Sequence, residues 1–78
     1  MTEQEIIQNL KSVFDEVFDG KIEFSTELTK ENEEAWDSVE HIRFALALEE
    51  KFDVTFSLDE LDEITSIKDV VKILQNGN

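Results

Sequence analysis

The chain has 78 residues, with 20 Asp and Glu against 7 Lys and Arg, which gives a formal net charge of −13. A chain of this length forms one domain with one core, so we expect a single domain over residues 1–78. Phosphate backbones and anionic membranes repel such an acidic surface. The charge therefore argues against nucleic acid and membrane partners and favours partners with basic patches.

The composition favours helices. The chain has no proline and two glycines, which argues against a hairpin-rich sheet. It has no cysteine, so thiol nucleophiles, zinc–thiolate sites and redox motifs are excluded. No apolar run approaches the roughly 20 residues of a membrane span, and the acidic residues 1–5 resemble neither a secretory nor a mitochondrial signal. We therefore expect an all-α protein of the cytoplasm.

The first segment predicts a helix that ends at Asp19-Gly20. Thr2 and Glu5 fit a capping box, with Thr2 as the N-cap and Glu5 at the third helical position. Glycine at position 20 is free to take the left-handed conformation that ends many helices. The apolar residues after the cap recur at steps of three and four and form one stripe: Ile6, Ile7, Leu10, Val13, Phe14, Val17 and Phe18.

Residues 21–36 lack a helical period and predict a long loop, with a short helical turn possible around residues 30–34. Connections of this length are uncommon in small domains and are often functional. We expect the loop to be fixed to the core by its apolar residues, which are Ile22, Phe24, Leu28 and Trp36.

A second helix is predicted from Asp37-Ser38 to Phe52, where Asp53 ends it. Asp37 is a suitable N-cap, and Glu40 stands where it would complete a capping box. The predicted buried side of this helix consists of Val39, Ile42, Ala45, Leu46 and Leu48, widened by Phe44 and Ala47.

Two further helices complete the prediction. Ser57 can cap a brief helix over residues 58–61, in which Leu58 and Leu61 would face inward and after which Ile64 would anchor the turn. Ser66 can cap the last helix, with Asp69 at its third position, and Gly77 would lie in a short tail. The apolar stripe of that helix is Ile67, Val70, Val71, Ile73 and Leu74. The expected fold is a small all-α helical bundle of three main helices and one short helix, with a long loop between the first and second helices.

The inventory of reactive side chains argues against an enzyme. His41 lies three residues after Ser38, but the sequence has no Gly-x-Ser-x-Gly elbow, and so small a bundle offers little room for a substrate pocket. We expect His41 to be a surface residue beside the serine. Residues 53–64 lack the glycine and the glutamate that a calcium-binding loop needs at its sixth and twelfth positions, and Leu58 and Ile64 stand there instead. We predict no specific metal site.

Ser38 has the properties of an attachment point. At the first position of a helix its side chain is expected to face solvent, and the helix N-terminus favours a negative group there. A phosphodiester on its Oγ would lie where free backbone N–H groups point. The alternative is that Asp37 and Ser38 are both ordinary capping residues.

Three segments of the chain share a recognisable frame. The frame is an Asp-Ser-aliphatic triplet, a Leu-Glu-x-x-Phe ending to the helix that follows, and an Ile-Thr-Ser-aliphatic start to the last helix. This chain has Asp37-Ser38-Val39, then Leu48-Glu49 and Phe52, then Ile64-Thr65-Ser66-Ile67. Together with the first helix and the long loop, the frame resembles the acyl carrier protein family and its peptidyl carrier relatives over essentially the whole chain.

The resemblance implies a function. A phosphopantetheinyl transferase would attach 4′-phosphopantetheine from coenzyme A to Ser38, and the terminal thiol of this arm would hold acyl or aminoacyl groups as thioesters. The partners would be acyl-activating and acyl-transferring enzymes with basic docking surfaces, in a lipid, polyketide, peptide or surface-polysaccharide pathway, and the carrier would be a monomer. Asp37 would orient the modifying enzyme. The partner-binding residues would be Val39, Glu40, Ile42, Arg43, Glu49 and Glu50.

The sequence departs from the carriers of fatty acid synthesis at two places. Those carriers usually have Gly-x before the Asp-Ser pair, where this chain has Ala35-Trp36, and they tend to hold an acidic residue where this chain has Arg43. The departures favour a stand-alone carrier of a specialised pathway. The competing hypothesis is an unmodified acidic helical module that binds a basic partner; it explains the charge and the helices but not the position of the serine.

Overall fold

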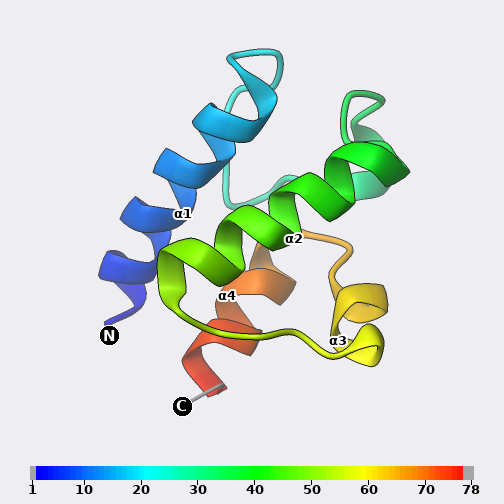
Figure 1. Cartoon of the computed structure of the whole chain (residues 1–78). Coiled ribbons are helices and arrows are strands. Elements are labelled where there is room, and N and C mark those ends of the chain that lie inside the picture. Colours follow the sequence, from blue (N-terminus) through cyan, green and yellow to red (C-terminus); the bar gives the residue numbers. More distant parts are fainter. Residues whose placement is uncertain (1, 77–78) are drawn as a thin grey trace.

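The helices begin and end at the capping residues of the sequence. The computed structural model describes residues 2–76, so Gly77 and its predicted tail lie outside the described residues. The elements are α1 (Glu3–Phe18), α2 (Ser38–Phe52), α3 (Leu58–Glu63) and α4 (Ile67–Asn76), with a 3-10 turn, η1, at Lys30–Asn32. In Figure 1, α2 crosses in front of α4, with α1 at the left and α3 at the lower right. The predicted all-α fold, with three main helices and one short helix, is confirmed.

The ends of α1 show how local sequence sets the helix boundaries. The Thr2 hydroxyl accepts a hydrogen bond from the Glu5 N–H at 3.2 Å, and the Glu5 carboxylate accepts one from the Thr2 N–H at 3.0 Å. The predicted capping box is therefore present. At the other end, the left-handed backbone begins at Asp19 (φ 51°), one residue before the expected Gly20 (φ 76°). Aspartate is among the few residues that tolerate this conformation.

An aromatic cluster forms the centre of the core. Phe14 and Phe18 come from α1, Phe44 from α2 and Trp36 from the end of the long loop, and each is at most 1% exposed. The Phe14 and Phe44 ring centroids lie 5.8 Å apart at 89°, and those of Trp36 and Phe44 lie 5.6 Å apart at 85°. These edge-to-face contacts are favourable for aromatic rings. The cluster joins α1, α2 and the loop in one packed unit.

The buried face of α2 differs from the prediction. Val39, Ile42 and Leu46, which were expected in the core, are exposed by 68%, 50% and 59%. The buried residues are His41, Phe44, Ala45 and Leu48. Two apolar rows run along this helix at helical spacing, and the row that carries the large Phe44 ring packs against the aromatic cluster. The other row remains on the surface.

The short helix α3 is less embedded than expected. It continues to Glu63, and Ser57 and Glu60 form a capping box at its start. Leu58 was expected to face inward, but it is 80% exposed, because it lies in the first turn beyond the edge of the core. Leu61 is half-buried, and no side chain of α3 is fully buried. Ile64, directly after the helix, is 2% exposed and anchors this segment as predicted.

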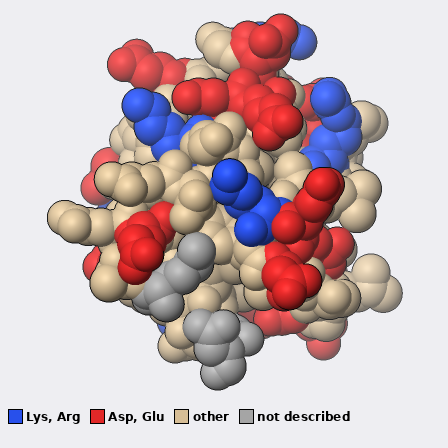
Figure 2. Space-filling view, turned by 60° about the vertical axis from the view of Figure 1, so that its left-hand side comes forward, with Lys and Arg blue, Asp and Glu red and all other residues tan. Residues whose placement is uncertain are grey.

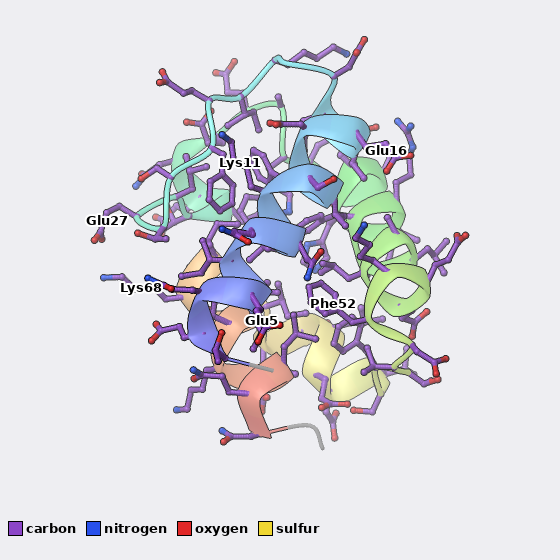
Figure 3. All side chains as sticks on the ribbon, turned by 90° about the vertical axis from the view of Figure 1, so that its left-hand side faces the viewer. Glu5, Lys11, Glu16, Glu27, Phe52 and Lys68 are labelled. Atoms are coloured by element: carbon purple, nitrogen blue, oxygen red, sulfur yellow. The ribbon has the colours of Figure 1, made fainter. Side chains whose placement is uncertain are left out.

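The long loop is fixed both to the core and to the start of α4. Ile22 and Trp36 are buried, and Phe24 and Leu28 pack partly against the core, as expected. The Lys30 N–H donates to the Thr65 carbonyl at 2.8 Å, and the Ile67 N–H donates to the Leu28 carbonyl at 3.0 Å. Glu27 and Lys68 form an ion pair of 3.0 Å on the surface beside these bonds (Figure 3).

Asp69 stabilises the start of α4. The Ser66 hydroxyl accepts a hydrogen bond from the Asp69 N–H at 3.1 Å, which confirms the predicted cap. The Asp69 carboxylate accepts hydrogen bonds from the Thr65 N–H and hydroxyl at 3.1 and 2.8 Å. Partial burial acts to raise the pKa of Asp69, but these hydrogen bonds and the charge of Lys72 outweigh it, so the pKa lies below its ordinary value.

We expect Asp69→Asn to lower the free energy of unfolding at pH 7. Because the pKa of Asp69 is lower in the folded chain than in the unfolded chain, its stabilising contribution is present above the unfolded pKa of about 3.9. The contribution is lost as the pH falls through the lower, folded value. Urea unfolding between pH 7 and pH 3 should show a gap between wild type and variant that closes at low pH. Asp62→Asn, on the exposed side of α3, is the control; an equal gap at all pH values would contradict the prediction.

We expect Phe44→Ala to lower the free energy of unfolding by about 3–5 kcal/mol, because it leaves a cavity in the aromatic cluster. A chain of this size has roughly 4–12 kcal/mol of stability in total, so this loss is a large fraction of it. The matched control is Leu46→Ala on the exposed row of the same helix, which we expect to change stability by about 0.5 kcal/mol or less. Urea unfolding followed by circular dichroism measures both, and similar losses would contradict the assigned face.

Candidate functional site

Ser38 is the first residue of α2 and is exposed, as predicted. Asp37 before it has an extended backbone, and its Oδ1 accepts a hydrogen bond from the Glu40 N–H at 2.9 Å. The Asp37 carbonyl accepts another from the His41 N–H at 2.8 Å. Asp37 therefore starts the helix and fixes the backbone on both sides of Ser38. Near the Ser38 Oγ, the N–H groups of the first turn have no carbonyl partner within the helix.

The predicted capping box at this site is incomplete. The Asp37 side chain caps the Glu40 N–H, but the Glu40 carboxylate does not return to the Asp37 N–H. It accepts a hydrogen bond from the Arg43 guanidinium at 2.7 Å instead. A cation three residues along the helix is within easy reach of a carboxylate and attracts it more strongly than a neutral N–H. The negative charge of Glu40 is therefore partly offset next to Ser38.

His41 was expected on the surface, and this expectation is wrong. His41 is 9% exposed, and its Nδ1 lies 3.0 Å from the Trp36 Nε1. An indole N–H can only donate, so the His41 Nδ1 accepts and carries no proton. The His41 Nε2–H then donates to the Leu61 carbonyl in α3, also at 3.0 Å. The fully buried Trp36 needs an acceptor for its N–H, and this need was the sequence signal for a buried histidine nearby.

The two bonds of His41 also bear on catalysis. Its Nδ1 is occupied by the Trp36 N–H, and its Nε2–H is directed to the Leu61 carbonyl. Neither nitrogen is therefore free to take a proton from Ser38, which a serine nucleophile requires. Among residues 2–76, no group of three or more His, Asp and Glu side chains is placed to hold a metal ion. Within the same residues, no helix has the length and apolar character needed to cross a membrane.

An exposed apolar row begins beside Ser38 and runs along α2. It consists of Val39, Ile42 and Leu46, which are the residues that the aromatic core leaves on the surface. Arg43, with a side chain 59% exposed, lies between Ile42 and Leu46 in the sequence. An exposed row of this kind, bordered by charged side chains, is typical of a surface that binds other proteins.

The predicted acidic residues of α2 have different environments. Glu50 is exposed, whereas Glu49 is half-buried and its Oε2 accepts a hydrogen bond from the Phe56 N–H at 2.8 Å. Glu49 therefore fixes the connection between α2 and α3, a role that sequence reasoning missed. Figure 2 shows that Asp and Glu outnumber Lys and Arg over the face in view. The face in that view is therefore predominantly negative.

Comparison with known proteins gives two matches. Residues 33–74 match the family described as "Phosphopantetheine attachment site". The chain is also 32% identical to the acyl carrier protein of Coprothermobacter proteolyticus, in an alignment that covers 99% of this chain and 95% of the relative. These matches show that the chain carries a covalently attached 4′-phosphopantetheine group.

Among the serines of the matched segment, Ser38 suits such a group best. Attachment as a phosphodiester requires an accessible hydroxyl. Residues 33–74 contain three serines, and two of them are used as caps: the Ser57 and Ser66 hydroxyls accept hydrogen bonds from the Glu60 and Asp69 N–H groups. The structure records no hydrogen bond of the Ser38 Oγ to residues 2–76, and the residue is exposed. The chemistry of the site therefore fits the group.

Proposed function

Because the chain belongs to the acyl carrier protein family, we propose that Ser38 is the residue on which it carries 4′-phosphopantetheine. The observation that supports this assignment most strongly is that the Ser38 hydroxyl is exposed and unbonded at the start of α2, whereas Ser57 and Ser66 cap helices. Asp37 contributes by starting the helix, which sets the direction of the Ser38 side chain. A phosphodiester there is also favoured by the N-terminal end of the helix.

The arm supplies the reactive thiol that the cysteine-free chain lacks. In the proposed function, an acyl group is held on this thiol as a thioester, and the carrier presents it to successive partner enzymes. The chain itself makes and breaks no bond of the cargo. The family match favours this function over the alternative of an unmodified acidic module, which requires no attachment site.

We expect Ser38→Ala to abolish modification. Incubation of the wild-type protein with coenzyme A and a broad-specificity phosphopantetheinyl transferase should add about 340 Da, the mass of one phosphopantetheinyl group. Intact-mass spectrometry should show this gain in the wild type and none in the variant. Ser12→Ala, an exposed position on α1, is the control and should be modified normally. A modified Ser38→Ala variant, or an unmodified wild type with several transferases, would refute the assignment.

For the partner surface, we propose the exposed row of Val39, Ile42 and Leu46 together with Arg43 and the carboxylates of Glu40 and Glu50. The apolar side chains would supply contact area, and the acidic ones would steer basic partners to α2. Such contacts are weak and sensitive to salt, which suits a carrier that must leave each enzyme in turn. Glu49 contributes indirectly, because its carboxylate is already bound to the Phe56 N–H.

We further propose a specialised pathway over primary fatty acid synthesis. Arg43 lies on the exposed side of α2 and pairs with Glu40, so this part of the surface has less negative charge than an acidic residue at position 43 would give. Ala35-Trp36 stands where the fatty-acid carriers usually have Gly-x, and Trp36 is a buried anchor of the core. Polyketide, nonribosomal-peptide and cell-surface polysaccharide pathways use stand-alone carriers of this kind.

We expect Arg43→Glu to raise the kcat/KM of fatty-acid-synthesis enzymes for this carrier several-fold, because it restores a negative charge where these enzymes present basic groups. The matched control is Lys51→Glu, which makes the same change of charge at the far end of α2. Steady-state kinetics of acyl transfer at low and high salt measure the effect. Unchanged rates, or an equal gain for the control, would contradict the role of Arg43.

A further inference from the structure

The strongest unexplained feature of the molecule is the contact of one imidazole with two separate segments. The His41 ring accepts the Trp36 N–H at 3.0 Å and donates to the Leu61 carbonyl at 3.0 Å. We call this pair of hydrogen bonds the imidazole bridge. Trp36 ends the long loop and Leu61 lies in α3, 20 residues after His41. The bridge therefore connects the loop to α3 through a side chain of α2.

Two residues of the imidazole bridge flank the proposed attachment residue in the sequence. Trp36 lies two residues before Ser38, and His41 lies three residues after it. The helix at the other end of the bridge, α3, has no buried side chain, and its Leu61 is half-buried. In a helix of this length the carbonyls of the last turn lack partners within the helix, and the His41 N–H satisfies one of them. The bridge is thus a direct tie between α3 and the segment around Ser38.

The bridge requires one protonation state. The Trp36 N–H can donate only to an unprotonated Nδ1, and the Leu61 carbonyl can accept only from a protonated Nε2. The neutral Nε2–H tautomer meets both conditions. If His41 gains a second proton, its Nδ1–H faces the Trp36 N–H, and two donors oppose each other without an acceptor. The bond to the Leu61 carbonyl is still possible, so the bridge would open at its Trp36 end.

We propose that His41 is a pH-sensitive positioning residue, which in its neutral form holds α3 to the segment around Ser38 and releases Trp36 when it is protonated. The inference rests on the proposed function for the role of Ser38 alone. Histidine is the side chain whose ordinary titration falls between pH 5 and 8. The consequence is a carrier whose surface near the arm is ordered at neutral pH and loosened in mild acid.

The packing around Trp36 indicates which side of the imidazole bridge moves when His41 is protonated. Trp36 is 1% exposed and lies against Phe14, Phe18 and Phe44 with ring centroids 5.6–6.3 Å apart. It is therefore fixed by the core, and the imidazole with α3 must move away from it. Within residues 2–76 the structure records no ion pair of His41 with a carboxylate. The charged residues within two positions of Trp36, His41 or Leu61 in the sequence are Glu34 in the loop, Asp37, Glu40 and Arg43 beside or in α2, and Asp59, Glu60, Asp62 and Glu63 in α3.

The first test reads the bridge in the whole, unmodified chain by NMR. At pH 8 the ¹⁵N shifts of His41 should show the Nε2–H tautomer, and the Trp36 indole proton should exchange slowly. When the pH is lowered toward 5.5, any protonation of His41 seen in its ¹⁵N shifts should be accompanied by a shift of the indole resonance and by faster amide exchange in α3 than in α1. An Nδ1–H tautomer at pH 8 would overturn the proposal. So would a His41 that stays neutral at pH 5.5, or α3 exchange that does not respond to its protonation.

A second test uses variants and a functional measurement. In the His41→Gln variant, the glutamine amide offers one acceptor and one donor and does not titrate. Amide hydrogen exchange in α3 of this variant should therefore be the same at pH 8 and pH 5.5. His41→Phe keeps a ring but neither bond, and α3 should exchange fast at both pH values. If His41→Phe fails to fold, the comparison of wild type with His41→Gln decides. A pH response of α3 in His41→Gln equal to that of the wild type would overturn the proposal.

The functional measurement is the rate of phosphopantetheine transfer with one transferase. The ratio of wild-type to His41→Gln rates should fall several-fold from pH 8 to pH 5.5, because the pH dependence of the transferase cancels in the ratio. A constant ratio would overturn the effect on Ser38. If neither protein is modified at any pH, the proposed attachment at Ser38 is wrong. The NMR measurements then still test the imidazole bridge independently.

Discussion

The burial of Trp36 is the constraint on which the rest of the structure depends. Its indole lies against Phe14 and Phe18 of α1 and Phe44 of α2, and its N–H is bonded to His41. This anchor fixes where the long loop ends, so that Asp37 follows as the N-cap and α2 begins at Ser38. The same packing turns the Phe44 row of α2 inward and leaves Val39, Ile42 and Leu46 outside. One buried side chain thus determines both the place of the serine and the face beside it.

The carrier surface follows from this division of α2. A single helix provides the core contact with one row and leaves the other row, which we propose as the partner contact, on the surface beside the serine. The acidic residues are also divided: Glu49 holds the connection to α3 and Glu40 pairs with Arg43, whereas Glu50 is exposed. The number of carboxylates in the sequence therefore overstates the charge that a partner meets on this helix.

Local signals predicted well, and signals that depend on distant residues did not. The caps at Thr2, Ser57 and Ser66 could be predicted because each bond joins residues three apart in the chain. The buried face of α2 could not, because its two apolar rows differ little in hydrophobicity and the choice depends on aromatic rings of another helix. The burial of His41 was missed for a similar reason, since its acceptor, Leu61, belongs to a different helix.

The unbonded hydroxyl of Ser38 has a consequence for how a group attached there affects the fold. The other two serines of the matched segment would each lose a helix cap if their oxygen were esterified. At Ser38 no recorded contact of the folded chain has to be given up. If Ser38 carries the arm as proposed, the bare and the loaded protein can therefore share one fold. In that proposal, attachment and removal of the arm leave every helix cap in place.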